Sequence, residues 1–202
     1  MDAAQANRAR EIYEASFPKS QRVPFDALLA SDGDANRVQL VGLQEGAVLV
    51  VLTMSWLEST DWWFLEYLAV APETRSQGIG TRAWNEAIKR AGGSDAARIV
   101  FEVDPPEEAD IGSSERAIRQ RRVDFYRRLG AELLPLGEFH APATTGDGLQ
   151  RFALMARTTA KEVMPAGPAL GQLAASVLTD GYGLNPGDPL VRRALDTGSA
   201  VG

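Results

Sequence analysis

Three runs of apolar residues dominate the first half of the chain, and their spacing predicts strands. Residues 37–43 alternate between apolar and polar side chains, and residues 47–56 form a long run rich in β-branched residues. A third run covers residues 62–70 and ends before Pro72. The connections between the runs are short and polar, which predicts an antiparallel meander.

A helix and a fourth strand follow the third run. Apolar residues recur at helical spacing from Ile79 to Ala91, with charged residues on the other face, and Gly92 and Gly93 then end the helix. Residues 98–103 are again apolar and β-branched. This strand–helix–strand order predicts a parallel, right-handed crossover within a mixed sheet.

The rest of the pattern predicts further helices and two late strands. The helices cover residues 4–16, 23–29 and 115–129, and the strands cover residues 131–136 and 149–156, with a turn-rich segment at 141–148. After residue 157 the composition changes, and short helices are predicted at 170–178 and 190–195. We therefore expect one domain over residues 1–157 and a helical C-terminal extension, residues 158–202, packed on it.

Composition narrows the chemistry. The chain has 202 residues, no cysteine and a single histidine, His140, which excludes disulfides and a cysteine nucleophile and disfavours a zinc site, so we expect no metal. The net charge of −6 argues against a nucleic-acid partner and suits cationic, amine-bearing substrates. Neither a signal peptide nor a membrane-spanning run is visible, which predicts a cytoplasmic enzyme without membrane contact.

The loop between the third strand and its helix has the chemistry of a phosphate cradle. It reads Arg75-Ser76-Gln77-Gly78-Ile79-Gly80-Thr81. The first turn of a helix leaves backbone N–H groups without partners and attracts anions, and glycines there allow close approach. Two other interpretations compete: the run Gly78-x-Gly80-x-x-Ala83 fits a dinucleotide fingerprint, as in an NAD-binding oxidoreductase, or the glycines serve packing alone. Against the dinucleotide, residues 72–75 separate the strand from the first glycine, and no second nucleotide-binding half is visible.

Two motifs in this order resemble the GNAT superfamily of N-acetyltransferases. Arg75-x-x-Gly78-x-Gly80 is similar to the family signature [QR]-x-x-G-x-[GA], and residues 124–131, DFYRRLGA, are similar to its Y-x-x-L-G segment. The resemblance covers about residues 13–155. It implies the GNAT α/β fold, a mixed and mostly antiparallel sheet with helices on both faces, and acetyl-CoA as co-substrate. The coenzyme-binding residues it implies are Leu68, Ala69, Val70, Arg75, Ser76, Gln77, Gly78, Ile79, Gly80, Thr81, Arg119 and Tyr126.

The resemblance also implies roles for single residues, and at some positions this chain departs from the family pattern. The family fold opens with a strand before its first helix, for which the first residues here leave little room. Tyr126 corresponds to the tyrosine that protonates the departing coenzyme A thiolate in many members, although a core aromatic is the simpler interpretation of the residue alone. Arg119 stands where many members have an asparagine; with its neighbouring arginines it either reaches the coenzyme phosphates or forms a solvated helix face.

Two carboxylates are candidates for the general base that an amine acceptor needs, because an alkyl amine is mostly protonated at neutral pH. Glu102 lies in Phe101-Glu102-Val103, which resembles the L-E-V segment of ribosomal-protein alanine acetyltransferases. Glu66 is a carboxylate inside an otherwise apolar strand flanked by aromatic residues, which also requires an explanation. The family resemblance implies that these two strands separate where acetyl-CoA inserts, so either carboxylate could face the reaction; the alternative is that one of them is paired structurally with an arginine.

The reaction implied by the resemblance is acetyl transfer from acetyl-CoA to a primary amine. The absence of cysteine favours direct attack in a ternary complex. The acceptor remains open between small molecules and a protein N-terminus, and a homodimer is compatible with the sequence. A catalytically silent acyl-CoA-binding regulatory module is the alternative from another class of function.

Overall fold

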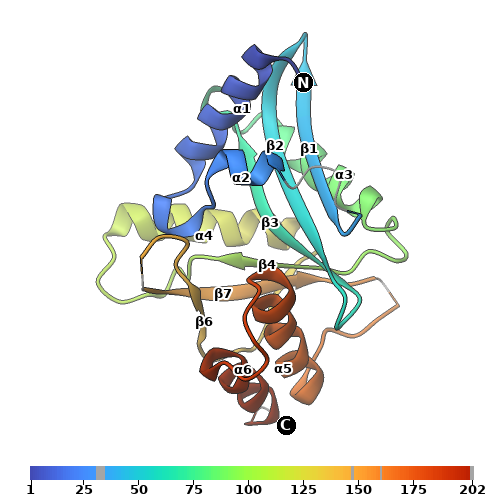
Figure 1. Ribbon diagram of the computed structural model, residues 1–202, viewed down its shortest axis with the longest axis vertical. Helices are drawn as coiled ribbons and strands as arrows, with labels where there is room; N and C mark the ends of the chain where they lie inside the picture. Colours follow the sequence, from blue (N-terminus) through green and yellow to red (C-terminus); the bar gives the residue numbers. More distant parts are fainter. Residues whose placement is uncertain (31–34, 147, 160, 201–202) are drawn as a thin grey trace.

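Seven strands form one open, mixed sheet in the computed structural model, which describes residues 1–30, 35–146, 148–159 and 161–200 (Figure 1). The order along the sheet is β1-β2-β3-β4-β7-β5. β6 lies outside this order and pairs with β7. The strands are β1 (Arg37–Gln44), β2 (Ala47–Leu57), β3 (Trp62–Val70), β4 (Ile99–Val103), β5 (Glu132–Leu133), β6 (Phe139–Pro142) and β7 (Leu149–Arg157).

The helices lie on both faces of this sheet. They are α1 (Ala3–Ser16), α2 (Phe25–Ala30), α3 (Ile79–Arg90), α4 (Ser113–Arg128), α5 (Gly167–Ser176) and α6 (Pro189–Ala200), with short helical turns at η1 (Lys19–Gln21), η2 (Pro72–Thr74) and the π-helical η3 (Val177–Gly181). None of the helices in the described part of the chain is long and apolar enough to cross a membrane.

Both predicted connectivities of the sheet are confirmed. β1, β2 and β3 form an antiparallel meander, and β3 pairs with β4 in parallel after the crossover through α3. The parallel contact is short: within the described residues, only the pairs Trp63–Ile99 and Phe64–Val100 join β3 to β4. Beyond Phe64 the two strands separate, and this opening positions the site described below.

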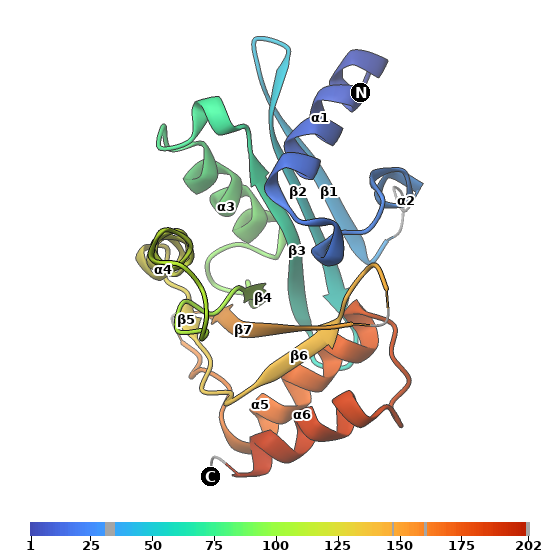
Figure 2. The ribbon, with the colours of Figure 1, turned by 90° about the vertical axis from the view of Figure 1, so that its left-hand side faces the viewer.

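Three apolar clusters hold the helices on the sheet. One cluster, centred on Trp84 and Phe101, lies under α3 and α4 on one face. On the other face, α1 and α2 cover a cluster around Tyr13 and Tyr67, and α5, η3 and α6 cover a third around Phe64. Figure 2 shows these layers from the side, with α3 and α4 across the sheet from α1 and α2.

Several sequence-based expectations change at element boundaries. Before α1 the sequence left little room for the strand with which the family fold opens, and among the described residues none occurs there; Asp2 caps α1 directly through a hydrogen bond from the Gln5 backbone amide. The strand predicted at 131–136 is only Glu132–Leu133. The sequence also missed β6, whose residues pair with β7 in a hairpin around the predicted turn-rich segment. Residues 147, 160, 201 and 202, which fall in the predicted turn and extension, lie outside the described residues.

The C-terminal extension contributes fully buried side chains to the third cluster. Leu170, Leu173 and Val177 are at most 1% exposed and pack with Phe64 of β3 and Val100 of β4. Burial of this kind against two central strands supports the expectation that the extension folds together with the rest of the chain.

Substituting Leu170→Ala tests that expectation. Removing a fully buried leucine side chain leaves a cavity, so the free energy of unfolding should fall by about 2–5 kcal/mol in a single transition. Val163→Ala is the control, because Val163 is 92% exposed and the change should stay within about 0.5 kcal/mol. Two separate transitions in calorimetry, with only one shifted by Leu170→Ala, would show that the extension is an independent unit.

Candidate active site

A cavity of about 810 Å³ opens where β3 and β4 separate. Its walls come from the end of α1, from β3, from the loop before α3, from β4 and from α4. The cavity brings together most of the residues predicted from the sequence, although they are up to 60 positions apart. These are Glu66, Leu68, Ala69, Val70, Arg75, Ser76, Gly78, Gly80, Thr81, Glu102 and Tyr126.

Three predicted coenzyme-binding residues do not line this cavity. The side chain of Ile79 is buried in the cluster under α3, and the Gln77 side-chain Nε2 donates a hydrogen bond to the Glu73 carbonyl at 3.2 Å. Arg119 is ion-paired with Glu108 and Glu115, and its side chain is only 14% exposed, so it neither lines the cavity nor lies on a solvated face. The arginines that do reach the cavity wall from α4 are Arg121, Arg122 and Arg128.

The start of α3 has the backbone geometry of an anion-binding site. Gly78 is the N-cap in the left-handed region at φ 78°, and a Cβ there would meet nothing within 4 Å. The first helical hydrogen bond joins the Arg82 amide to the Gly78 carbonyl at 3.0 Å, so the amides before Arg82 begin the helix without intrahelical partners. Gly80 serves packing as well, since a Cβ there would lie 3.2 Å from Phe125 Cζ.

Glu66 occupies a β-bulge in the central strand. Thr53 pairs with Tyr67 and Met54 pairs with Leu65, which leaves Glu66 as the extra residue. Its carboxylate forms an ion pair with Arg37 of β1. Burial raises the pKa of the Glu66 carboxyl, while the Arg37 charge acts in the opposite direction. Glu66 is therefore a carboxylate that already has a cationic partner.

Glu102 has a different environment. Its Oε2 accepts a hydrogen bond from the Tyr182 hydroxyl at 2.7 Å, whereas its Oε1 is buried and has no hydrogen-bond partner among the described residues. Burial raises the pKa of the Glu102 carboxyl to about 8; the hydrogen bond from Tyr182 lowers it, and the nearby Asp104 and Glu66 charges raise it further. One oxygen of this carboxylate is thus available to accept a proton.

Tyr126 lies at the junction of α4, α3 and β4. Its ring centroid is 4.3 Å from that of Phe101, 5.3 Å from that of Trp84 and 5.0 Å from that of Phe125. The ring is therefore a core aromatic as well as part of the cavity wall. Burial raises the pKa of the Tyr126 phenol to about 12, and the Arg122 charge lowers it. The phenol stays protonated at neutral pH, as a proton donor must.

Sequence reasoning missed Tyr182 entirely. It lies in the segment Tyr182-Gly183-Leu184-Asn185-Pro186, whose composition indicates only a turn between two short helices. The one signal available was a hydroxyl-bearing aromatic residue in a largely apolar tail. Such a residue is most often a packing residue, and no local spacing connects it with Glu102, which lies 80 positions earlier.

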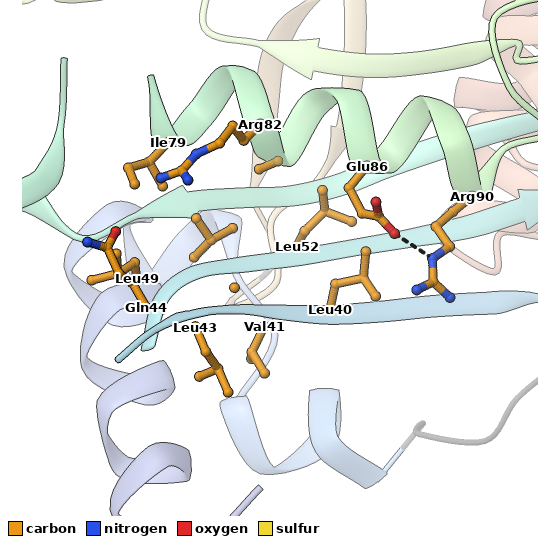
Figure 3. A pocket seen from close by; sticks show the side chains of 13 residues that line it. Leu40, Val41, Leu43, Gln44, Leu49, Leu52, Ile79, Arg82, Glu86 and Arg90 are labelled. Atoms are coloured by element: carbon orange, nitrogen blue, oxygen red, sulfur yellow. Dashed lines mark hydrogen bonds and ion pairs between the residues drawn. The ribbon is translucent and has the colours of Figure 1, made fainter. Parts of the chain in front are cut away.

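A second cavity, of about 670 Å³, lies on the α3 side of β1 and β2 (Figure 3). Leu40 of β1 and Leu52 of β2 point toward α3 here, whereas Val41 and Leu43 point away from it, and the charged side chains on the helix are Arg82, Glu86 and Arg90. Glu86 and Arg90 pair with each other at 2.9 Å. Apart from these side chains and Gln44 the lining is apolar, and its carboxylate, Glu86, is already paired, so the candidate acid–base groups lie in the first cavity. No cluster of metal-ligating side chains occurs among the residues described.

The comparisons with known proteins agree with this geometry. The family model described as the acetyltransferase (GNAT) family matches residues 6–131. Similar solved structures include a Bacteroides thetaiotaomicron protein assigned to the GNAT family, with 21% identity, a TM-score of 0.68 and coverage of 87% of this chain and 90% of that one. A search of curated proteins finds no match.

Two further solved structures carry more specific names. A phosphinothricin acetyltransferase from Sinorhizobium meliloti in complex with acetyl-CoA has 21% identity and a TM-score of 0.54, over 82% of this chain and 93% of that one. The ribosomal-protein-S18-alanine N-acetyltransferase from Escherichia coli has 18% identity and a TM-score of 0.53, over 82% and 96%. At these identities the likeness establishes the fold.

A split, mostly antiparallel sheet beside a glycine-lined helix start defines the acyltransferase fold that binds coenzyme A. The chain belongs to the GNAT acetyltransferase family, because the family model covers more than half of it, from residue 6 to residue 131. Membership supports acyltransferase activity and replaces the dinucleotide interpretation, which required a second nucleotide-binding half and a parallel sheet.

The cradle can be tested at Gly78 with a matched pair of variants. Asn and Asp both tolerate the left-handed region, but only Asp adds a negative charge where the pyrophosphate is expected. Gly78→Asp should bind acetyl-CoA at least about tenfold more weakly than Gly78→Asn in calorimetric titration, since unit charges about 4 Å apart repel by about 4 kcal/mol near a protein surface. Equal affinities in the two variants would place the pyrophosphate elsewhere.

Proposed function

We propose that the protein is an N-acetyltransferase that transfers the acetyl group of acetyl-CoA to a primary amine by direct attack. The observation that carries this proposal is the composition of the first cavity. One space is lined by a helix start suited to pyrophosphate, by a carboxylate with a free buried oxygen and by a protonated phenol. These are the three parts that amine acetylation by a thioester requires.

The coenzyme is expected to lie between β3 and β4. Its pyrophosphate would occupy the start of α3, near Arg75, and its pantetheine amides would pair with the backbone of Leu68, Ala69 and Val70. That edge of β3 faces the opening and, in the described residues, has no strand partner beyond Phe64. The thioester would then reach the part of the cavity lined by Glu66 and Glu102.

Glu102 is the better candidate for the general base. Its pKa of about 8 is high for a carboxyl group, so the carboxylate is a stronger base than usual, and its Oε1 is free to accept a proton. Glu66 is held by Arg37, and proton uptake there would leave a partly buried guanidinium without its charged partner. We therefore assign Glu66 to shaping the bulge and Glu102 to the proton transfer.

The proposed proton balance is simple. The ammonium form of the acceptor loses a proton to Glu102 Oε1, and the amine nitrogen attacks the carbonyl carbon of the thioester. The carbon–sulfur bond then breaks, and the Tyr126 hydroxyl protonates the departing thiolate. The excess proton on the nitrogen passes to the Tyr126 oxygen, which leaves the neutral amide, and Glu102 releases its proton to solvent. With pKa values near 8 and 12, the carboxylate and the phenol are in the required protonation states together at mildly alkaline pH.

The acceptor is proposed only as a class. Glu66, Glu102 and Asp104 make the region acidic, which suits a cationic amine. The names of similar structures include an aminoglycoside, a ribosomal-protein alanine and phosphinothricin as acceptors of those proteins, so the fold does not select among small molecules and protein N-termini. The sequence-based predictions of a cytoplasmic location, of no nucleic-acid partner and of a possible homodimer stand as predictions.

The proposal is tested by incubating the protein with acetyl-CoA and a panel of primary amines. Thiol release and acetylated product should appear with at least one amine, and kcat/KM should rise with pH through about 8 as Glu102 ionises. Glu102→Gln should lower kcat/KM by about 10²–10⁴-fold and recover part of it at higher pH, where more of the amine is neutral.

Glu66→Gln is the matched comparison. It should cause a smaller, pH-independent loss together with lower stability, because Arg37 loses its charged partner. A larger and pH-dependent loss in Glu66→Gln than in Glu102→Gln would reverse the two assignments. Tight binding of acetyl-CoA without turnover across the whole panel would instead identify a coenzyme-binding regulatory module.

Tyr126→Phe tests the proton donor while keeping the ring and its packing. We expect kcat to fall by about 10²–10⁴-fold with the affinity for acetyl-CoA little changed. Because the phenol pKa is about 12, the wild-type rate should show no alkaline limb from this residue below about pH 11. Full kcat in Tyr126→Phe, under conditions where chemistry limits turnover, would mean that water protonates the thiolate.

A further inference from the structure

The C-terminal extension places one polar side chain against the acid–base groups. The Tyr182 hydroxyl donates to Glu102 Oε2 at 2.7 Å, and its ring packs on Phe64 with the centroids 6.2 Å apart. Phe64 is the last β3 residue that pairs with β4, so Tyr182 lies at the point where the two strands separate. The extension therefore contacts the site itself as well as the core.

Tyr182 is held in place by its own backbone and by the two residues that precede it. Its amide donates to the Val177 carbonyl at 3.1 Å, which closes the π-helical turn before it. The preceding Gly181 lies so close to β3 that an added Cβ would be 3.0 Å from Phe64 Cδ1. Asp180 accepts hydrogen bonds from the amide and hydroxyl of Ser59, at 2.9 and 3.1 Å, in the turn between β2 and β3.

This anchoring has a consequence for the carboxylate. A glutamate side chain rotates about its terminal bond, so a free carboxylate would exchange its two oxygens. A fixed donor on Oε2 leaves Oε1 as the oxygen directed to the acceptor. Burial and the neighbouring negative charge of Glu102 raise the pKa of the Tyr182 phenol, so the group is a hydrogen-bond donor throughout the working pH range.

We propose that Tyr182 is a positioning residue for Glu102, and that the C-terminal extension is thereby part of the active site. The proposal rests on the proposed function, because it concerns the orientation of the general base. The proposal also goes beyond the proposed function, because it assigns a role to a segment that lies outside residues 6–131, the part matched by the family model.

The electrostatic surroundings determine the sign of the effect. The hydrogen bond from Tyr182 favours the charged carboxylate and lowers the pKa of Glu102, against the raising effects of burial, Asp104 and Glu66. Tyr67 of β3 also faces this group, Arg37 is paired with Glu66, and Arg122 is paired with Asp104. Removing the Tyr182 hydroxyl should therefore move ionisation of Glu102 to higher pH.

Tyr182→Phe tests this proposal because it keeps the ring against Phe64 and removes only the hydroxyl. We expect kcat/KM for the amine at neutral pH to fall about 10- to 100-fold, while the KM for acetyl-CoA stays within about twofold. The acidic limb of the profile of kcat/KM against pH should move up by about one pH unit. Tyr13→Phe is the matched control: it removes another buried hydroxyl, bonded to the Val23 carbonyl at 2.9 Å, and should leave the acidic limb in place.

Two further measurements separate positioning from a purely structural role. In the Glu102→Gln background, Tyr182→Phe should cost almost no further activity, because the hydroxyl acts through the carboxylate. Additive losses in the double variant, or an unmoved acidic limb in Tyr182→Phe, would overturn the proposal.

The same question can be answered without turnover. Carboxyl-carbon NMR of protein labelled at glutamate, with Glu102→Gln to assign the signal, should show the Glu102 midpoint shifted upward in Tyr182→Phe. If the wild-type protein acetylates no amine in the panel, the proposed function fails, while this titration still decides whether Tyr182 controls Glu102. An unchanged midpoint with an active wild-type enzyme refutes the positioning role alone.

Discussion

The early end of the pairing between β3 and β4 is the constraint on which the rest of the site depends. Beyond Phe64 and Val100, β3 remains hydrogen-bonded to β2 as far as Val70, and β4 remains bonded to β7 through Val103. Each strand therefore has one satisfied edge and one edge that faces the opening. Backbone polar groups in such a place need partners from water or from a ligand, because burying them unpaired is costly. An extended molecule with amide groups, such as pantetheine, is suited to that edge.

The opening also joins two faces of the sheet that carry different chemistry. The α3–α4 face provides the helix start at Gly78 and the phenol of Tyr126, whereas Glu102 shares a side of β4 with Val100, which packs under the C-terminal extension. In an intact sheet these groups would be separated by a layer of backbone. In the proposed mechanism, a thioester in the gap is reached by the base, Glu102, from one face and by the acid, Tyr126, from the other.

The local parts of this arrangement could be predicted from the sequence, and the long-range parts could not. The start of α3 at Ile79 and the strand character of residues 62–70 follow from hydrophobic spacing, and the bounds agree with the structure. β6 was missed because Phe139-His140-Ala141-Pro142 contains a proline and lacks a clear alternation, so only its pairing with β7 defines it as a strand. The pairing of Arg119 with Glu108 depends on a loop whose path no periodicity reveals, whereas its pairing with Glu115 is a local contact within α4.

Glu102 shows why the long-range contacts, which the sequence does not predict, matter for function. The sequence identified it as a carboxylate in an apolar strand, but its basicity depends on two opposing effects. Burial alone would keep the group protonated well above neutral pH, and full solvation would leave it too weak a base to deprotonate an ammonium group. The hydrogen bond from Tyr182 offsets part of the burial effect, and the pKa of about 8 is the result of both. A general base is most effective when its pKa is near the working pH. In the proposed mechanism Glu102 is that base, and the hydroxyl that lowers its pKa comes from a tyrosine 80 residues away.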